Sequence, residues 1–145
     1  MHETSEKRGS LSDWMIYLES LHPKTIEMGL ERVDQVKLKL GLNPVFPIII
    51  VGGTNGKGSI CAMLEAILNC AGYGVGCYTS PHLLRCNERI RIQKSEITDE
   101  ALCQAFETVN YARTICGVSL TFFEFFTLAA MHIFMQARVD VAILE

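Results

Sequence analysis

The chain of 145 residues is long enough for one domain, and its 49% hydrophobic and 20% charged residues are typical of a globular protein, which argues against a disordered chain. Its 13 basic and 16 acidic residues give a net charge of −3, so we expect no general attraction to nucleic acid or to an anionic membrane. The polar start lacks a secretory signal, and no C-x-x-C pair occurs among the six cysteines, which favours reduced, buried thiols and a cytoplasmic location.

The N-terminal segment predicts a short tail followed by a helix. Residues 1–10 are polar and are expected to form a disordered tail, so that the domain covers residues 11–145. Apolar residues at helical spacing predict a helix over residues 11–22, with Ser12 or Asp13 as its N-terminal cap.

The next segment predicts a second helix and then a β-α-β unit. Apolar spacing over residues 30–40 predicts the helix, which is expected to end at Gly41. The apolar run 48–51 predicts a strand that is buried on both faces, as in a parallel sheet. A helix over residues 60–71 and a strand over 75–79 complete the unit, and ligands of such sheets bind beyond the carboxyl ends of the strands.

The last third of the chain predicts two more helices and a final strand. Residues 88–93 alternate polar and apolar, which indicates a strand or hairpin arm outside the main sheet. A helix that Thr98 caps and an almost wholly apolar helix over residues 121–137 follow. The apolar run 139–144 predicts a strand that ends in the carboxylate of Glu145. Together these elements predict an α/β fold with a mainly parallel sheet flanked by helices.

A glycine-rich segment separates the first predicted strand from the third predicted helix. Its glycines allow a tight turn that points backbone N–H groups inward, and the helix start adds its positive dipole end. The segment resembles the phosphate-loop pattern G-x-x-x-x-G-K, except that Gly58 replaces the usual Ser or Thr and the hydroxyl comes one residue later, at Ser59. A glycine turn with a solvated lysine is the alternative. The predicted ATP-binding residues are Gly53, Thr54, Asn55, Gly56, Lys57, Gly58 and Ser59, with Lys57 also predicted to be catalytic.

The carboxylate of Glu145 is the predicted second element of the nucleotide site. An acid at the carboxyl end of a strand beside a phosphate loop commonly takes part in binding the metal ion. It is also the last residue of the sequence. We therefore expect the fold to be truncated at a central strand and the chain to be the N-terminal piece of a longer protein.

Four groups of segments occur in an order that resembles one family. They are residues 24–32, 53–59, 79–83 with 87–90, and 121–124 with 143–145. With these motifs the chain resembles the bacterial bifunctional dihydrofolate synthase/folylpolyglutamate synthases, which are Mur-ligase-like enzymes. The resemblance implies a phosphate-loop fold of the Mur-ligase central-domain type. It also implies an enzyme that uses ATP and Mg²⁺ to join L-glutamate to dihydropteroate or to a folate through an acyl phosphate. The protein is expected to be a monomer.

The resemblance also implies roles for individual residues. Ser80 and Glu145 correspond to metal ligands, and their hydroxyl and carboxylate oxygens suit Mg²⁺. The alternative for Ser80 is that it is a turn residue before Pro81. A further metal ligand, a modified lysine and a second domain would follow Glu145, so we expect this chain alone to be inactive. The segments that correspond to the dihydropteroate pocket contain Glu27, Met28, Gly29, Leu30, Thr121, Phe122, Phe123 and Glu124.

Several of these residues have a structural alternative. Thr121 and Glu124 form a T-x-x-E capping box, which would explain both without a ligand. Phe123 is suited to stack on a pterin, although a Phe-rich helix is more often core. His82 is given no catalytic role. The arginines of the 85–91 segment would either steer an anionic folate tail or lie on a solvated strand face; they are Arg85, Arg89 and Arg91.

Two other functions are compatible with these residues. A small-molecule kinase of the phosphate-loop class would transfer the phosphate and leave it on the acceptor, with no need for an amine. An inactive nucleotide-binding fragment is the second alternative.

Overall fold

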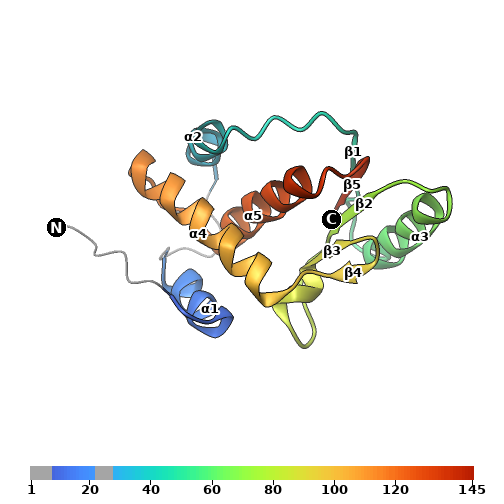
Figure 1. Ribbon diagram of the computed structural model, residues 1–145, viewed down its shortest axis with the longest axis horizontal. Helices are drawn as coiled ribbons and strands as arrows, with labels where there is room; N and C mark the ends of the chain where they lie inside the picture. The colour runs from blue at the N-terminus through green and yellow to red at the C-terminus, as the bar shows by residue number, and fades with distance from the viewer. Residues whose placement is uncertain (1–7, 22–27) are drawn as a thin grey trace.

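The structure is a computed structural model that describes residues 8–21 and 28–145. Helices lie on both sides of a central sheet, with α3 on one side and α4 and α5 on the other (Figure 1). This arrangement confirms the α/β fold that the sequence predicts. The elements in chain order are α1 (Leu11–Ser20), α2 (Glu31–Leu40), β1 (Ile48–Ile50), α3 (Lys57–Cys70), β2 (Val75–Tyr78), the 3₁₀ turn η1 (Cys86–Arg89), β3 (Ile90–Ile92), β4 (Ser95–Glu96), α4 (Asp99–Cys116), α5 (Phe122–Ala137) and β5 (Val141–Leu144).

The sheet has the strand order β1-β5-β2-β3-β4. Strand β5 pairs in parallel with both β1 and β2, and Ile143 lies opposite Ile49 on one side and Cys77 on the other. Strand β3 pairs antiparallel with β2, and the two-residue strand β4 pairs antiparallel with β3. The prediction that residues 88–93 lie outside the main sheet is therefore wrong. Their strand begins only at Ile90, and backbone pairing with β2 draws it into the sheet.

The larger core lies between the sheet and the helices α1, α2, α4 and α5. Rings of Trp14, Phe106 and Phe125 contact one another at its centre, and Phe126 stacks on Tyr78 of β2. In β2, a Cβ atom added at Gly76 would come within 2.5 Å of the Phe134 ring, so α5 approaches the strand closely only because this position has no side chain. This packing fixes α5 against β2.

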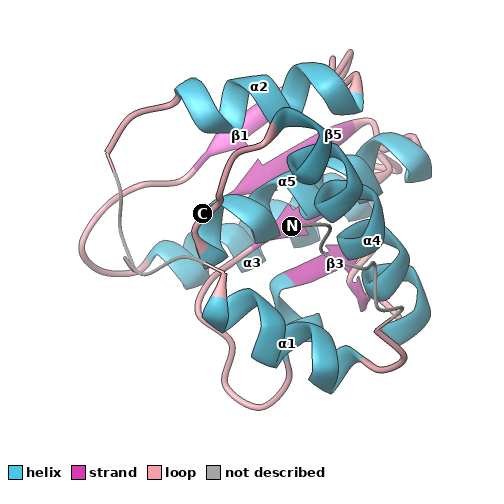
Figure 2. Cartoon of the chain, turned by 90° about the vertical axis from the view of Figure 1, so that its left-hand side faces the viewer, coloured by secondary structure: helices cyan, strands magenta, loops and turns pink. Residues whose placement is uncertain are grey.

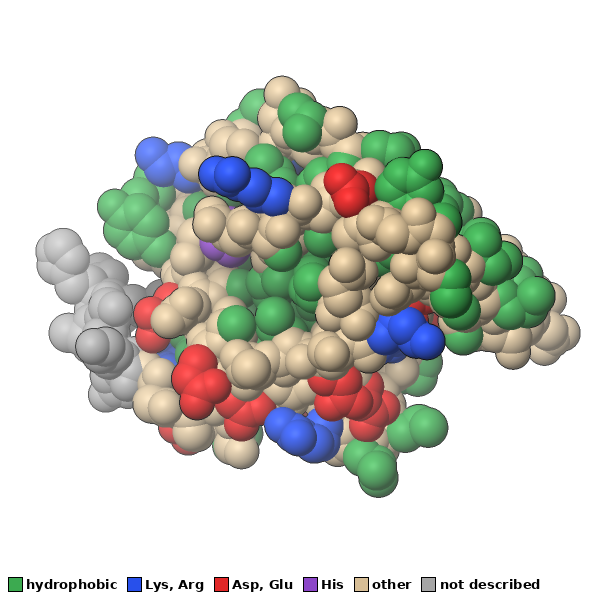
Figure 3. All heavy atoms as spheres, turned by 45° about the vertical axis from the view of Figure 1, so that its right-hand side comes forward, with side chains coloured by type: hydrophobic (Ala, Val, Ile, Leu, Met, Phe, Trp, Pro, Cys, Tyr) green, Lys and Arg blue, Asp and Glu red, His purple; other side chains and the backbone are tan. Residues whose placement is uncertain are grey.

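The smaller core lies under α3, on the opposite face of the sheet. Cys61 and Cys77 are buried there with valines and an isoleucine of the three parallel strands. The other side of α3 exposes Ile60, Met63 and Ile67, and Figure 3 shows hydrophobic side chains on that side of the molecule. The sequence pattern therefore predicts the helix, while the residues that it buries are set by the sheet.

Strand β1 departs from the prediction that it is buried on both faces. Ile50 is 78% exposed and Ile48 is also exposed, because β1 is an edge strand among the described residues and pairs only with β5. Ile49 packs against the smaller core, and Val51, the residue after the strand, is buried in it.

Helix ends follow local signals in most places. Gly41 and Gly117 end α2 and α4 in the left-handed conformation that favours glycine. At the start of α1 the cap is Ser10, because its hydroxyl accepts a hydrogen bond from the Asp13 amide while the Asp13 carboxylate accepts one from the Ser10 amide. The predicted cap at Ser12 or Asp13 is thus wrong, although Asp13 takes part in the capping box. Residues 1–7 of the tail predicted over 1–10, and the end of the helix predicted over 11–22, lie outside the described residues.

Among the described residues, no helix combines the length and the apolar character needed to cross a membrane.

The buried cysteines are expected to resist alkylation. Burial raises the pKa of the Cys77 thiol to about 12, so almost no reactive thiolate forms at pH 8, whereas Cys70 is exposed. Iodoacetamide at pH 8 should therefore modify Cys70 in the native chain and Cys77 only in urea, as read by mass spectrometry of the peptides. Equal rates of modification at the two thiols in the native chain would contradict the packing of α3 on the sheet.

Candidate functional site

The glycine-rich loop connects β1 to α3 and is open to solvent. Gly53 and Gly56 have φ values of +146° and +77°, which L side chains rarely adopt. Three residues separate Gly52 from Gly56, one fewer than in the G-x-x-x-x-G-K pattern. Apart from half-buried Lys57, the predicted ATP-binding residues are exposed. The loop thus leaves its backbone accessible to a ligand.

The start of α3 presents backbone donors to this loop. Gly56 occupies the N-cap position, and no side chain caps the first turn of the helix. The Lys57 ammonium folds back over the loop and donates a hydrogen bond to the Gly53 carbonyl at 2.8 Å. Uncapped amides, a helix dipole and a lysine therefore face the same loop, which is the arrangement that binds phosphate groups.

Glu145 lies between the strands that lead to the two predicted ligand loops. Its amide donates to the Tyr78 carbonyl at 2.9 Å, and the Val51 amide donates to the Leu144 carbonyl at 2.7 Å. The strand before the glycine loop and the strand before Ser80 therefore flank the strand that ends at Glu145. In Figure 2, β5 points toward the C-terminus at this edge of the sheet. The predicted nucleotide and metal residues thus share one edge.

The side chains at this edge fit a magnesium ion that phosphate groups help to hold. Ser80 and Glu145 offer hydroxyl and carboxylate oxygens, the hard donors that Mg²⁺ prefers. Within the described part of the chain, no cluster of three or more His, Cys, Asp or Glu residues could hold a metal ion by itself. Mg²⁺ commonly binds to one or two protein ligands together with substrate phosphates, so two such residues beside a phosphate loop are compatible with it.

A buried ion pair connects α3 to the strand pair beside Ser80. The Glu65 carboxylate of α3 accepts hydrogen bonds from the Arg91 guanidinium of β3 at 3.2 Å through each oxygen. Arg91 also donates to the Glu88 carbonyl at 3.0 Å and to the hydroxyl of Thr79, the residue before Ser80, at 3.4 Å. The helix that begins in the glycine loop is thereby fixed to the strand end that carries Ser80.

The loop after Ser80 is closed by the carboxylate of Glu88. Glu88 accepts hydrogen bonds from the amides of Leu83, Leu84 and Arg85, at distances of 2.8–2.9 Å. These bonds lower the pKa of Glu88, because they stabilise the ionised form. His82 is held in the same loop, since its Nδ1 accepts a hydrogen bond from Arg89 Nε at 2.8 Å. His82 thus makes a structural contact within this loop.

The predicted substrate segment at the start of α5 makes most of its polar contacts within the protein. The capping box is present, since the Thr121 amide donates to Glu124 at 2.8 Å and the Glu124 amide donates to Thr121 at 3.2 Å. Glu124 also pairs with Arg32 of α2 at 2.8 Å. Phe122 is partly buried, whereas Phe123 is 50% exposed and its ring centroid lies 6.1 Å from that of Tyr78. Of this segment, Phe123 offers the most accessible surface to a ligand.

Arg32 connects the two predicted substrate segments. It lies in the first turn of α2, just after Met28, Gly29 and Leu30, which are exposed, and it also donates to the Ser119 carbonyl at 3.0 Å. Residues 28–30 and 121–124 are therefore held near each other, although Glu27 lies outside the described residues. Arg32 is not among the site residues predicted from the sequence, because its partners are too far away in the chain for local spacing to reveal them.

The arginines near η1 do not form one solvated face. Arg85 is exposed and pairs with Asp99 at 2.9 Å, whereas Arg91 is partly buried and pairs with Glu65. Arg89 is buried and lies against the rings of Phe122 and Phe126. The expectation of a solvated strand face is therefore wrong for Arg89 and Arg91, because η1 and the pairing of β3 with β2 turn them into the protein.

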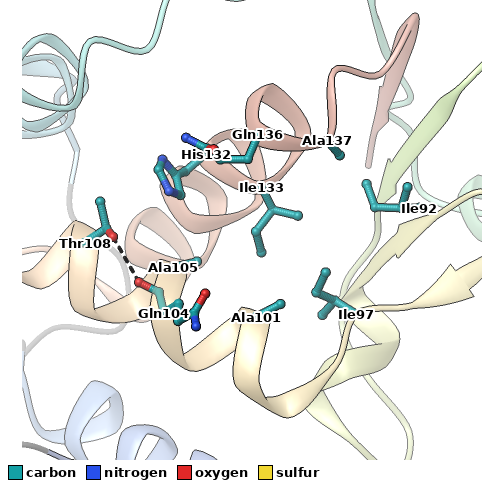
Figure 4. A pocket seen from close by; sticks show the side chains of 10 residues that line it. All are labelled: Ile92, Ile97, Ala101, Gln104, Ala105, Thr108, His132, Ile133, Gln136 and Ala137. Carbon is teal, nitrogen blue, oxygen red and sulfur yellow. Dashed lines mark hydrogen bonds between the residues drawn. The ribbon is translucent and has the colours of Figure 1, made fainter.

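A separate hollow of about 600 Å³ lies between α4, α5 and β3 (Figure 4). His132, Gln104 and Gln136 lie around an apolar floor that includes Ile92 and Ile133. Burial lowers the pKa of His132. None of the residues that the sequence predicts as a functional site lines this hollow, so it is distinct from the edge that carries Glu145.

The glycine loop, the parallel strands and the acid at the end of β5 define an α/β nucleotide-binding domain of the phosphate-loop type. A comparison with models of protein families finds no match. The chain is 48% identical, over 98% of its length, to the dihydrofolate synthase/folylpolyglutamate synthase of Escherichia coli strain K12, and it spans about 33% of that relative. Over the third of that enzyme that it spans, the chain is therefore similar to the dihydrofolate synthase/folylpolyglutamate synthases, and the predicted resemblance is confirmed.

Solved structures agree with this assignment. E. coli FolC in complex with DHPP and ADP has a TM-score of 0.91 at 48% identity, covering 98% of this chain and 34% of that one. A bifunctional folylpolyglutamate synthase/dihydrofolate synthase with Mn, AMPPNP and L-glutamate bound has a TM-score of 0.89 at 48% identity, covering 99% of this chain and 34% of that one.

Loss of the buried carboxylate on α3 is expected to destabilise the chain. Glu65→Ala leaves the partly buried Arg91 guanidinium without its anion, which costs about 3 kcal/mol of unfolding free energy. Urea unfolding followed by circular dichroism measures this loss. In the double variant Glu65→Met/Arg91→Leu no charge stays unpaired, and most of the stability should return. A loss in the double variant as large as in the single one would show that the ion pair is not the cause.

Proposed function

We propose that the full-length protein carrying this chain is an ATP-dependent amide ligase that adds L-glutamate to dihydropteroate and to the polyglutamate chain of tetrahydrofolate. The position of Glu145 carries this proposal, because backbone hydrogen bonds place it between the strand before the glycine loop and the strand before Ser80. The relatives' names support the same activity, and related structures hold ADP, AMPPNP, Mn, DHPP and L-glutamate. The chain spans about a third of these proteins, so residues 11–145 would be the ATP-binding part of the enzyme.

Each part of the edge has a role in this proposal. The backbone amides of residues 53–59 and the Lys57 ammonium bind the β- and γ-phosphates and neutralise their charge. Ser80 and Glu145 would hold Mg²⁺, which would act as a Lewis acid at the phosphate oxygens. The exposed ring of Phe123 contacts the pterin, and Arg32 keeps residues 28–30 beside it.

The reaction proposed for this site is the activation of a carboxylate. The substrate carboxylate attacks the γ-phosphate of ATP, which gives an acyl phosphate and ADP. The amine of L-glutamate then attacks the acyl carbon, and inorganic phosphate leaves as the amide bond forms. A phosphate-loop kinase would instead release no inorganic phosphate in response to an amine, so the need for glutamate separates the two functions.

Lys57→Ala in the full-length protein is expected to lower ATP-dependent phosphate release at least about 100-fold, because one of the charges on the transferring phosphate is lost. Release is measured with dihydropteroate present and with L-glutamate varied. Lys39→Ala is the matched control, since that lysine is exposed on α2, away from the loop, and should leave release unchanged. Release that does not depend on glutamate would contradict the ligase and favour a kinase or a simple ATPase.

Residues 1–145 alone are expected to show no release of ADP that depends on both dihydropteroate and glutamate. About two thirds of the related enzymes lies outside this chain, and we propose that this part completes the enclosure of the reacting groups. ADP release by residues 1–145 that needs both substrates would contradict this view, and it would leave the assignment of the ligase reaction intact.

A further inference from the structure

Arg89 places a buried positive charge between the loop after β2 and the start of α5. Its side chain is 9% exposed, and its Nε donates to His82 Nδ1 at 2.8 Å. The guanidinium carbon lies 5.2 Å from the ring centroids of both Phe122 and Phe126. One cation is thus enclosed by two aromatic rings and an imidazole.

No carboxylate among the described residues compensates this charge. The ion pairs in that part of the chain are Arg32 with Glu124, Arg85 with Asp99, and Arg91 with Glu65. A buried guanidinium normally has an anionic partner, because removing it from water is costly. The two rings offset only part of this cost. The surroundings of Arg89 are therefore suited to an anion that the described residues do not supply.

Arg113 shows how this chain satisfies a buried arginine that has a purely structural role. It is also 9% exposed and likewise has no carboxylate partner among the described residues. Its guanidinium donates to Asn110 Oδ1, to the Val118 carbonyl and to the Tyr17 hydroxyl, at distances of 2.9–3.2 Å. Arg89, by contrast, donates to no carbonyl or carboxylate oxygen of a described residue; besides His82, its polar neighbour is the Tyr78 hydroxyl. Its terminal nitrogens thus keep donor capacity.

Backbone hydrogen bonds define where Arg89 lies relative to the predicted site. The Arg89 carbonyl accepts a hydrogen bond from the amide of Thr79, the residue before Ser80, at 2.9 Å. The Tyr78 carbonyl accepts from the amide of Glu145 at the same distance, 2.9 Å. Phe122, on the other side of the guanidinium, belongs to the predicted substrate segment. Arg89 therefore lies where the predicted metal ligands and the predicted pterin contacts meet.

From these contacts we infer that Arg89 binds the carboxylate of an aromatic acid. The planar guanidinium can donate two parallel hydrogen bonds to a carboxylate, and the neighbouring Phe and Tyr rings suit an aromatic ring that carries it. The phosphates of the nucleotide already have the glycine loop and Lys57, so a carboxylate is the remaining anion. The inference rests on the proposed function, in which this is the carboxylate that ATP activates.

The test compares two ligands on the full-length protein by titration calorimetry. One ligand is dihydropteroate, and the other is its analogue with hydrogen in place of the carboxylate. Wild type should bind dihydropteroate about 10- to 100-fold more tightly than the analogue, which is the range for charged hydrogen bonds. Arg89→Met should remove this preference and leave the affinity for the analogue unchanged, whereas Arg89→Lys should keep part of it.

Melting temperatures provide the structural control. Arg89→Met should leave the melting temperature unchanged or raise it, because it removes an uncompensated buried charge, whereas Arg113→Met should lower it. Equal losses of affinity for both ligands in Arg89→Met would overturn the inference, as would equal binding of the two ligands by wild type. The test is separate from that of the proposed function: if carboxylate preference persists while phosphate release ignores glutamate, the ligase proposal fails and this subsite stands.

Discussion

The parallel pairing of β5 between β1 and β2 is the constraint on which the candidate site depends. Strands β1 and β2 are joined by α3 and do not pair with each other, so that within the described part of the chain only β5 holds their ends in register. The hydrogen bonds from Val51 to Leu144 and from Glu145 to Tyr78 continue this pairing past the ends of the strands. The glycine loop, Ser80 and Glu145 consequently share one edge, although they come from distant parts of the chain.

Local signals in the sequence predict much of this arrangement because the physical cause is itself local. Gly56 permits the positive φ that starts α3, and the Thr121 hydroxyl caps α5 within one helical turn. The final strand can also be read from its apolar run. The β-α-β pattern indicates parallel strands. Because parallel strands end at the same edge of a sheet, the pattern also predicts that the glycine loop, Ser80 and Glu145 meet at one edge.

The rest of the site depends on contacts that no spacing rule reveals. Glu65 lies on an apolar helix and is buried only because Arg91 reaches it from β3. Arg32 likewise acquires its role from Ser119 and Glu124, which are far from it in sequence. The exposure of Ile50 has the same origin, since an apolar strand is buried only where other elements cover it. Such features are properties of the tertiary structure. The resemblance to a family implies roles for individual residues, but it does not show which residues contact them.

The different environments of Arg89 and Arg91 show how a small change in local structure creates a site. In an uninterrupted strand these two residues would lie on the same face, because side chains alternate with a period of two. In the structure β3 begins at Ile90, and Arg89 ends the 3₁₀ turn η1. Arg91 therefore extends toward α3, where Glu65 neutralises it, while Arg89 lies against the rings of α5 on the opposite face of the sheet. The break in alternation places an uncompensated cation beside the predicted substrate segment, and a regular strand at the same residues would have placed both charges beneath α3.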